Sequence, residues 1–172
     1  MPKVTAYVDC ENKGKLLDEV RGYQDVTDEA TGKVLGGGPH ESLTFFADEP
    51  PRLEGDGRYP QPLTYIAGGV GTCLLANLKL FAIKMRLELR AARAHVEMDF
   101  FQNQRGSVWD GNIESGLREV RTRLEIESDE PEEKLLKLVR NAKRGCFAEN
   151  MVKAAAPVKG TVFINGREVE VE

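Results

Sequence analysis

The sequence predicts a single α+β domain whose strands pair mainly in antiparallel fashion. Strand and helix patterns follow one another in the order strands, helix, strands, helix and hairpin. The chain has no internal repeat and no dividing linker, and its 172 residues suit one domain, 1–172. Near the end, Asn165 and Gly166 stand between two short alternating runs, which is the strongest short signal of a β-hairpin.

The N-terminal third predicts strands joined by turns. Val4–Cys10 alternates and predicts a strand, whereas the pattern of Lys15–Arg21 fits a short helix or a strand equally well. Gly36–Pro39 breaks regular structure, and Ser42–Asp48 then predicts another strand. A long, turn-rich connection from Asp48 to Pro62 follows, and loops of this length inside a compact domain are often functional.

The middle of the chain predicts a long helix over Leu63–Met85, because apolar residues recur there at spacings of three and four. Apolar or small residues fill most other positions, so we expect this helix to be buried on several sides. Gly68, Gly69 and Gly71 each cost about 1 kcal/mol of helix propensity against alanine. We therefore expect another backbone to pack closely against the helix at these glycines.

Two alternating segments follow and predict a pair of strands. Ala94–Phe100 and Leu117–Glu127 each place apolar residues on one face and charged residues on the other. Gly106–Gly116 supplies the turn between them. Each strand is therefore expected to have one face in water.

The last third predicts two helices before the hairpin. Ser128–Glu133 is a helix start, with a capping side chain ahead of a proline and acidic residues in the first turn. The apolar face of this helix includes Cys146, and Gly145 is expected to break or bend it. A second, short helix is expected over Phe147–Ala155, ending before Pro157.

Composition excludes several classes of protein. With 28 acidic and 24 basic residues the net charge is −4, which argues against nucleic acid as the main partner. The N-terminus lacks a signal-peptide pattern, and the longest apolar stretch is interrupted by Asn77, Lys79 and Lys84. Three cysteines, an odd number, fit a reducing compartment. The sequence therefore predicts a cytoplasmic protein with no membrane partner.

Most common catalytic and cofactor motifs are absent. His40 and His95 are far apart, and no Cys-x-x-Cys or His-x-x-x-His spacing exists, so no metal site is predicted. Gly68–Gly71 lacks the remaining residues of a nucleotide-binding loop and lies inside a helical pattern. No Gly-x-Ser-x-Gly occurs. The sequence thus predicts no metal and no cofactor.

Two cysteines remain as candidate site residues, Cys73 and Cys146, while Cys10 is expected to be a small buried residue. Cys146 follows Lys143 and Arg144 and precedes a short helix, a setting that favours thiolate. Cys73 lies within a buried helix, where an apolar wall disfavours thiolate unless a cation is close. Spacing alone leaves two possibilities open, a thiol redox pair and two ordinary buried cysteines.

Several segments together resemble the OsmC/Ohr family of thiol-dependent hydroperoxide reductases, and in particular its OsmC-like branch. The similarity runs from about Ser42 to Glu172 and is weakest in residues 1–41. The segments that carry it are Phe46–Pro51, Pro60–Tyr65 followed by Gly71–Leu74, the placement of Cys146 near the end of the second long helix, and Pro157–Gly166.

The resemblance implies an intertwined homodimer in which sheets shared by both chains wrap two long central helices. It implies that Cys73 attacks an organic hydroperoxide and becomes a sulfenic acid. Cys146 would then resolve it as an intramolecular disulfide, which a dithiol reductant, possibly of the lipoyl type, would reduce. An apolar pocket suits such substrates.

One departure from the family keeps a second function open. Well-studied members carry a glutamate about ten residues before the first cysteine, paired with an activating arginine, whereas Leu63 and Thr64 stand at the equivalent positions here. Arg21, Arg52 and Arg58 are the candidates for that arginine. The alternative to a peroxidase is a non-catalytic OsmC-like module that binds an apolar small molecule or senses oxidants.

Overall fold

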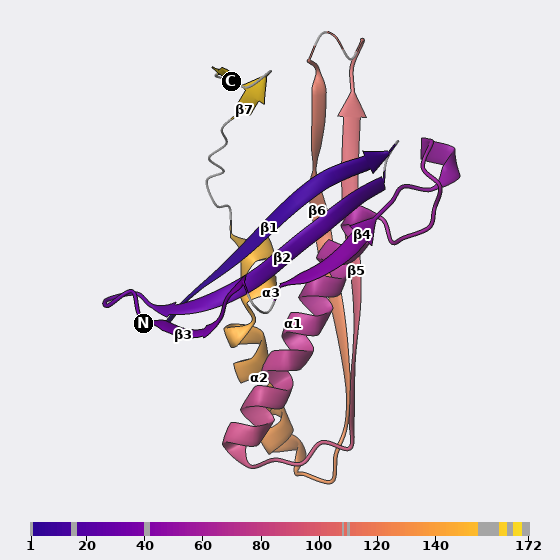
Figure 1. Ribbon diagram of the computed structural model, residues 1–172. Coiled ribbons are helices and arrows are strands. Elements are labelled where there is room, and N and C mark those ends of the chain that lie inside the picture. Colours follow the sequence, from indigo (N-terminus) through magenta and orange to yellow (C-terminus); the bar gives the residue numbers. More distant parts are fainter. Residues whose placement is uncertain are drawn as a thin grey trace. The chain divides into compact units, whose positions relative to one another are not determined.

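The structure is a computed structural model that describes residues 2–14, 17–39, 42–107, 109, 111–154, 162–164 and 167–169. The chain forms two compact units, Met1–Gly68 and Gly69–Glu172. The boundary between them falls at residues 68 and 69, inside helix α1 (Pro62–Met85). Figure 1 shows the elements of both units. Mixed α+β structure with antiparallel sheets is present in both units, as the sequence predicts.

The first unit contains a four-stranded antiparallel sheet centred on β2 (Leu17–Asp28). Strand β1 (Pro2–Gly14) pairs with one edge of β2 over its whole length. Strands β3 (Val34–Gly37) and β4 (Leu43–Ala47) share the other edge. The undecided segment Lys15–Arg21 is therefore strand from Leu17 onward, because both of its edges are paired.

The strand before the glycine-rich segment ends later than the sequence predicts. Gly36 and Gly37 still belong to β3, and the chain turns only at Gly37 and Gly38, whose φ angles are 77° and 118°. A Cβ at Gly37 would lie 2.0 Å from the carbonyl oxygen of Gln24. Glycine is therefore required where β3 leaves the sheet.

The long connection after β4 is organised by a buried carboxylate. Asp48 accepts backbone N–H groups from Glu49 at 2.9 Å, Arg58 at 3.0 Å and Asp56 at 3.4 Å. These hydrogen bonds, that of Arg58 first, lower the pKa of Asp48. A short 3-10 turn, η2 (Pro51–Leu53), lies inside the same loop. Asp48, at the start of the loop, is thus hydrogen-bonded to the backbone near its end.

Helix α1 confirms the predicted central helix and begins one residue earlier. Its buried positions form one stripe with a repeat close to four residues: Val70, Gly71, Leu74, Leu78 and Ala82. The expectation of burial on several sides is wrong for the single chain, since the opposite face stays open and Ile83 is 75% exposed. By length and composition α1 could cross a membrane, but the core helix of a soluble protein passes the same test.

The expected close packing at the three glycines holds at one of them. A Cβ at Gly71 would lie 3.3 Å from Cγ2 of Val96, whereas Cβ atoms at Gly68 and Gly69 would meet no described atom within 4 Å. The reason is geometric: Gly71 belongs to the buried stripe of α1, and the other two glycines do not.

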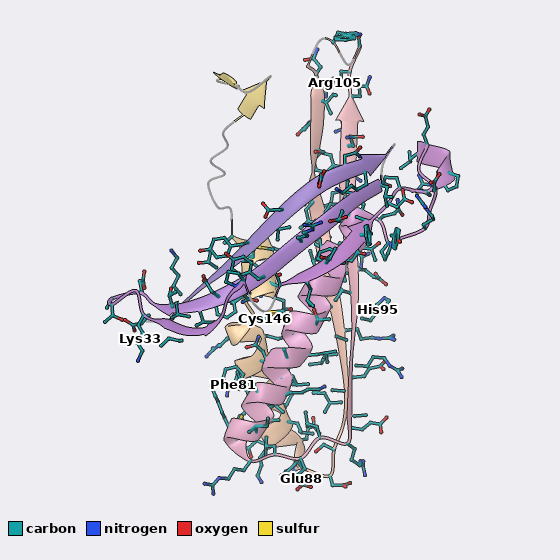
Figure 2. All side chains as sticks on the ribbon, viewed as in Figure 1. Lys33, Phe81, Glu88, His95, Arg105 and Cys146 are labelled. Atoms are coloured by element: carbon teal, nitrogen blue, oxygen red, sulfur yellow. The ribbon has the colours of Figure 1, made fainter. Side chains whose placement is uncertain are left out.

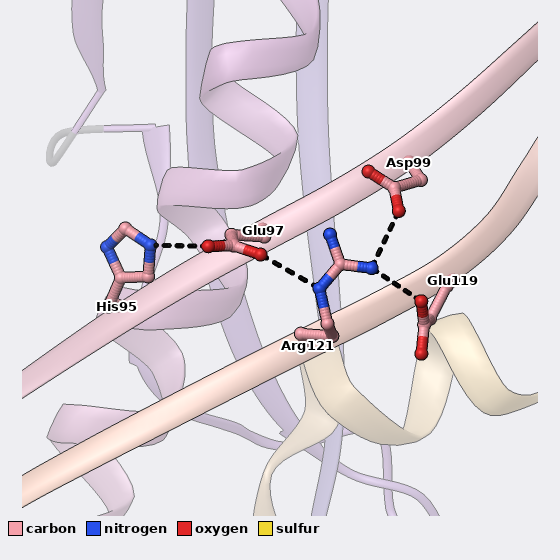
Figure 3. Close-up of polar contacts among 5 residues, drawn as sticks. All are labelled: His95, Glu97, Asp99, Glu119 and Arg121. Carbon is pink, nitrogen blue, oxygen red and sulfur yellow. Dashed lines mark hydrogen bonds and ion pairs between the residues drawn. The ribbon is translucent and has the colours of Figure 1, made fainter.

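In the second unit, β5 (Ala91–Gln104) and β6 (Ile113–Glu127) form a long antiparallel pair. The predicted turn Gly106–Gly116 is too long, because Ile113–Gly116 continues the pairing with β5. The predicted water-facing residues of both strands are exposed. In Figure 3, Arg121 of β6 bonds three of their carboxylates, Glu97 at 2.8 Å, Asp99 at 2.6 Å and Glu119 at 2.5 Å. His95, the predicted wet-face histidine, bonds Glu97 at 3.2 Å.

Helices α2 (Glu132–Gly145) and α3 (Phe147–Lys153) complete this unit and confirm the predicted break at Gly145. The start of α2 differs from the prediction: its N-cap is Pro131 and no side chain caps it. Ser128 instead accepts the N–H of Glu130 and donates to the carbonyl of Glu88, because it lies too far ahead of the first turn.

The core of the second unit lies between the two long helices and the β5–β6 pair. Fully buried Leu74 and Leu78 of α1 meet fully buried Leu138 of α2. Side chains from both strands, among them Ala92 and Leu124, pack against this cluster. The apolar stripes predicted for the two helices therefore face each other.

At the C-terminal end, β7 (Val162–Ile164) and β8 (Arg167–Val169) pair with Ile164 opposite Arg167. This register confirms the predicted hairpin. The turn residues Asn165 and Gly166, the segment 155–161 and His40 lie outside the described residues. The assignment of residues 1–172 to one domain stays a prediction.

Candidate functional site

The two candidate cysteines come together in the second unit. Cys146 is fully buried in the apolar cluster between α1 and α2, and half-buried Cys73 of α1 packs against that cluster. The two cysteines thus share one apolar cluster. Both are free thiols in this structure. Cys10, which the sequence predicts as buried, is instead exposed on β1, because that face of the strand is uncovered.

Cys146 occupies the joint between two helices. It ends α2 and starts α3, with an extended backbone at φ −74° and ψ 108° (Figure 2). Gly145, just before it, touches α1: a Cβ there would lie 2.9 Å from Cε2 of Phe81 and 3.4 Å from Oδ1 of Asn77. The absence of a side chain at Gly145 thus lets the joint approach the part of α1 that carries Cys73.

The sulfur of Cys73 has a hydrogen-bond donor one helical turn away. Nδ2 of Asn77 lies 3.0 Å from the Cys73 carbonyl oxygen and 3.7 Å from Cys73 Sγ. In the sequence, Asn77 stands out only as an interruption of the apolar run. The spacing of four residues on a helix was the available signal, because such pairs lie on one face.

The sulfur of Cys146 is bordered by a buried charged group that the sequence did not reveal. The backbone N–H of Glu149 donates to Cys146 Sγ at 3.5 Å. The Glu149 carboxylate accepts from Nζ of Lys143 at 2.6 Å and from Oγ1 of Thr122 at 3.2 Å. Lys143 also donates to Thr122 at 3.1 Å. Residues from β6, α2 and α3 thus converge beside Cys146.

The predicted preference of Cys146 for the thiolate form is wrong. Burial raises the pKa of Cys146, and the neighbouring Cys73 thiol and Glu149 carboxylate raise it further. The Glu149 N–H opposes this rise without reversing it. Lys143, expected to favour thiolate, has its charge committed to Glu149. Cys146 is therefore a neutral thiol near pH 7.

The candidate activating arginines all belong to the first unit. Arg21 forms an ion pair with Glu19 at 2.5 Å, and Arg58 with Asp56 at 3.0 Å. Leu63 and Thr64 lie in the first turn of α1 and provide no carboxylate. Which arginine serves Cys73 stays a prediction.

Two cavities of the second unit are candidate ligand-binding sites. One of about 270 Å³ is bordered by β6 and α3 and reaches Thr122 and Glu149. Another of about 420 Å³ lies where α1 ends and β5 begins, with Lys79 and Arg90 among largely apolar walls. No group of three or more potential metal ligands occurs among the described residues.

Comparison with known proteins decides the family. Residues 55–160 match the family described as OsmC-like protein. The chain belongs to the OsmC-like family. This membership confirms the resemblance stated from the sequence, and the matched segment contains both Cys73 and Cys146.

Solved structures of OsmC-like proteins share the fold of this family member. An OsmC-like hydroperoxide resistance protein from Jannaschia sp. CCS1 has 16% identity and a TM-score of 0.57, with 98% of this chain and 97% of that chain covered. An organic hydroperoxide resistance protein OsmC from Legionella pneumophila has 17% identity and a TM-score of 0.53, with coverages of 87% and 89%.

A third similar structure is the organic hydroperoxide resistance protein from Elizabethkingia anophelis. It has 18% identity and a TM-score of 0.53, and the alignment covers 87% of this chain and 88% of that chain. At these identities the similarity establishes the OsmC-like fold. No curated protein matches the sequence.

Proposed function

We propose that this OsmC-like protein reduces organic hydroperoxides with Cys73 as the peroxidatic and Cys146 as the resolving cysteine. The observation that carries the proposal is the meeting of these two thiols in one apolar cluster of a family member. The similar structures from Legionella and Elizabethkingia are named as organic hydroperoxide resistance proteins, which supports a peroxide-related role.

The proposed cycle has three balanced steps. Cys73 thiolate attacks the terminal oxygen of ROOH, the O–O bond breaks, and the alkoxide leaves as ROH after taking a proton, with Cys73 left as a sulfenic acid. The Cys146 sulfur then attacks the Cys73 sulfur, the S–O bond breaks, and the hydroxyl group leaves with the thiol proton as water. A dithiol finally reduces the disulfide by exchange and is itself oxidised to a disulfide.

The surroundings of the two sulfurs support this division of roles. Asn77 provides a donor to Cys73 and none of the described hydrogen bonds gives Cys73 a carboxylate neighbour. Cys146 is buried, and burial raises its pKa, so it is the less reactive thiol before Cys73 is oxidised. Apolar side chains of α1 and α2 surround both cysteines, which agrees with an organic substrate.

We propose that the working unit is a homodimer in the cytoplasm. The exposed face of α1 includes Leu80 at 47% and Ile83 at 75% exposure, which is unusual for apolar residues of a central helix. A second copy covering this face would bury it, in agreement with the intertwined dimer implied by the family. The reducing partner would be a dithiol of the lipoyl type.

Steady-state consumption of cumene hydroperoxide with dihydrolipoamide as reductant tests the proposal. The wild-type chain should turn over and Cys73→Ser should not. Cys146→Ser should react once, accumulate a sulfenic acid and form no Cys73–Cys146 disulfide by peptide mapping. Equal turnover in Cys73→Ser, or peroxide-treated wild type without this disulfide, would contradict the mechanism.

A binding function is the second candidate, and the cavity of about 420 Å³ favours it. Its apolar walls and the cations of Lys79 and Arg90 suit an anionic amphiphile, and Leu63 and Thr64 lack the family carboxylate. Melting in the presence of a fatty acid separates the two functions. A ligand-dependent rise in melting temperature without hydroperoxide turnover would favour binding, and rapid turnover would exclude a purely binding role.

A further inference from the structure

We propose that the ion pair of Lys143 with the buried carboxylate of Glu149 assigns the roles of the two cysteines: Glu149 holds Cys146 in the thiol form until Cys73 has been oxidised. This inference deepens the proposed peroxidase function and rests on it. Glu149 acts here as a positioning and electrostatic residue, since its carboxylate makes no bond to either sulfur in the described hydrogen bonds.

The position of Glu149 is the first support. Its backbone N–H contacts Cys146 Sγ at 3.5 Å, and its side chain is only 6% exposed. A carboxylate with so little water around it interacts with a neighbouring thiolate through a low effective dielectric constant. A negative charge on Cys146, the N-cap of α3, would therefore arise three residues before the existing negative charge of Glu149 in the first turn of that helix.

The hydrogen bonds of the carboxylate are the second support. Oε1 of Glu149 accepts hydrogen bonds from both Lys143 and Thr122. Oε2 of Glu149 is buried and has no hydrogen-bond partner in the described part of the chain. A buried charged oxygen without a partner costs free energy. Retention of this carboxylate beside a cysteine therefore points to a role beyond the ion pair.

The charged and titratable groups next to Cys146 come from three neighbouring elements. Cys73 from α1 and the Glu149 carboxylate from α3 disfavour its thiolate, whereas the backbone N–H of Glu149 favours it. Lys143 of α2 is the one cation in the group, and its Nζ lies between Glu149 and the neutral hydroxyl of Thr122 on β6. Lys143 and the Glu149 carboxylate thus act on the thiolate with opposite signs, and removing either charge shifts the balance.

The consequence is an asymmetric pair of thiols. A protonated, buried Cys146 does not attack peroxide, because the thiolate is the nucleophile. When Cys73 is a sulfenic acid, Cys146 loses its proton as it attacks, and water is the other product. The structure thereby separates the first oxidation from the resolving step.

The test is an ultraviolet thiolate titration of the folded chain carrying Cys10→Ser and Cys73→Ser, with the same chain plus Cys146→Ser subtracted as background. In this chain Cys146 is the only thiol. Glu149→Gln should lower the titration midpoint of Cys146 by about one pH unit, because a like charge is removed and Lys143 is left uncompensated. Lys143→Gln should raise the midpoint by a similar amount.

The opposite signs of the two shifts separate this role from a structural one. Loss of packing alone would expose Cys146 in both variants and lower both midpoints. Glu133→Gln and Lys137→Gln make the same charge changes in an exposed ion pair of α2 at 2.7 Å and should leave the midpoint unchanged. An unchanged or raised midpoint in Glu149→Gln would overturn the proposal, as would a lowered one in Lys143→Gln.

A second measurement addresses the assignment of roles and is independent of turnover. In the Cys73→Ser background, cumene hydroperoxide followed by a sulfenic-acid-trapping dione should label Cys146 several-fold more in Glu149→Gln than in the parent. Equal labelling would contradict role assignment. If wild-type Cys73 did not react with peroxide while the titration shifts held, the peroxidase function would fail and the electrostatic role would stand.

Discussion

The side-chain amide of Asn77 lies 3.7 Å from Sγ of Cys73 and 3.0 Å from its carbonyl oxygen. One amide group thereby fixes the side chain next to the proposed peroxidatic sulfur and offers it a donor. Leu63 and Thr64 provide no glutamate, so this amide is the side-chain donor that the described hydrogen bonds give to the Cys73 sulfur. Reactivity of Cys73 should therefore depend on Asn77.

Asn77→Ala should slow the reaction of Cys73 with cumene hydroperoxide roughly fivefold, which corresponds to about 1 kcal/mol for one lost hydrogen bond. Stopped-flow measurement of the single-turnover rate checks this. Asn141→Ala is a matched control, since its amide lies 3.7 Å from the unreactive thioether of Met85. Equal rates in wild type and Asn77→Ala would remove Asn77 from the mechanism.

Gly145→Ala should destabilise the fold by about 1 kcal/mol and slow disulfide formation, because the new Cβ would lie 2.9 Å from the ring of Phe81. Denaturant unfolding and peptide mapping measure the two effects. Phe81→Leu in the same chain should restore part of the loss by making room for the methyl group, as a double-mutant cycle would report. Absence of any coupling between the two positions would contradict the contact.

Asp48→Asn should lower the melting temperature near pH 7, since Asp48 accepts three backbone N–H groups as a carboxylate. The pKa of Asp48 is lowered in the folded chain from its ordinary value of 3.8. Its contribution is therefore complete above pH 3.8 and is lost as the pH falls through the lower, folded value. The difference between wild type and variant should accordingly shrink on acidification below pH 3.8.

Asp28→Asn is the control for that measurement. Asp28 also has a lowered pKa, through hydrogen bonds from Thr31 and Ala30, but it sits in an exposed turn. Its replacement should change the melting temperature less than Asp48→Asn does. A larger effect at Asp28 would show that burial of the loop carboxylate is not the deciding factor.

If the proposed dimer forms through the exposed apolar face of α1, Ile83→Glu should shift it to monomer in analytical ultracentrifugation, because the variant places a charge on that face. A buried unpaired charge at an interface is costly. Leu53→Glu, an equally drastic change at a half-exposed position of η2, is the control and should leave the dimer intact. A wild-type chain that sediments as a monomer would refute the dimer.

The sequence by itself determined most of the secondary structure. Alternation over Leu117–Glu127 and the helical spacing over Leu63–Met85 require no tertiary information, because the periods of strands and helices differ. The pattern of Lys15–Arg21 fits a helix or a strand equally well, so this segment required tertiary information. Its pairing with β1 and β4 makes it a strand from Leu17 onward. The membership in the OsmC-like family was likewise readable from segment order and spacing.

Only the tertiary structure decided the environment of the thiols. Thr122 of β6 and Lys143 of α2 meet Glu149 of α3 beside Cys146, and Cys73 of α1 packs against the cluster that contains Cys146. The sequence suggested that cations activate Cys146, but burial and a nearby carboxylate reverse that expectation. Periodicity reports which face of an element is apolar, whereas a pKa depends on the charges and solvent that three-dimensional packing brings to one atom.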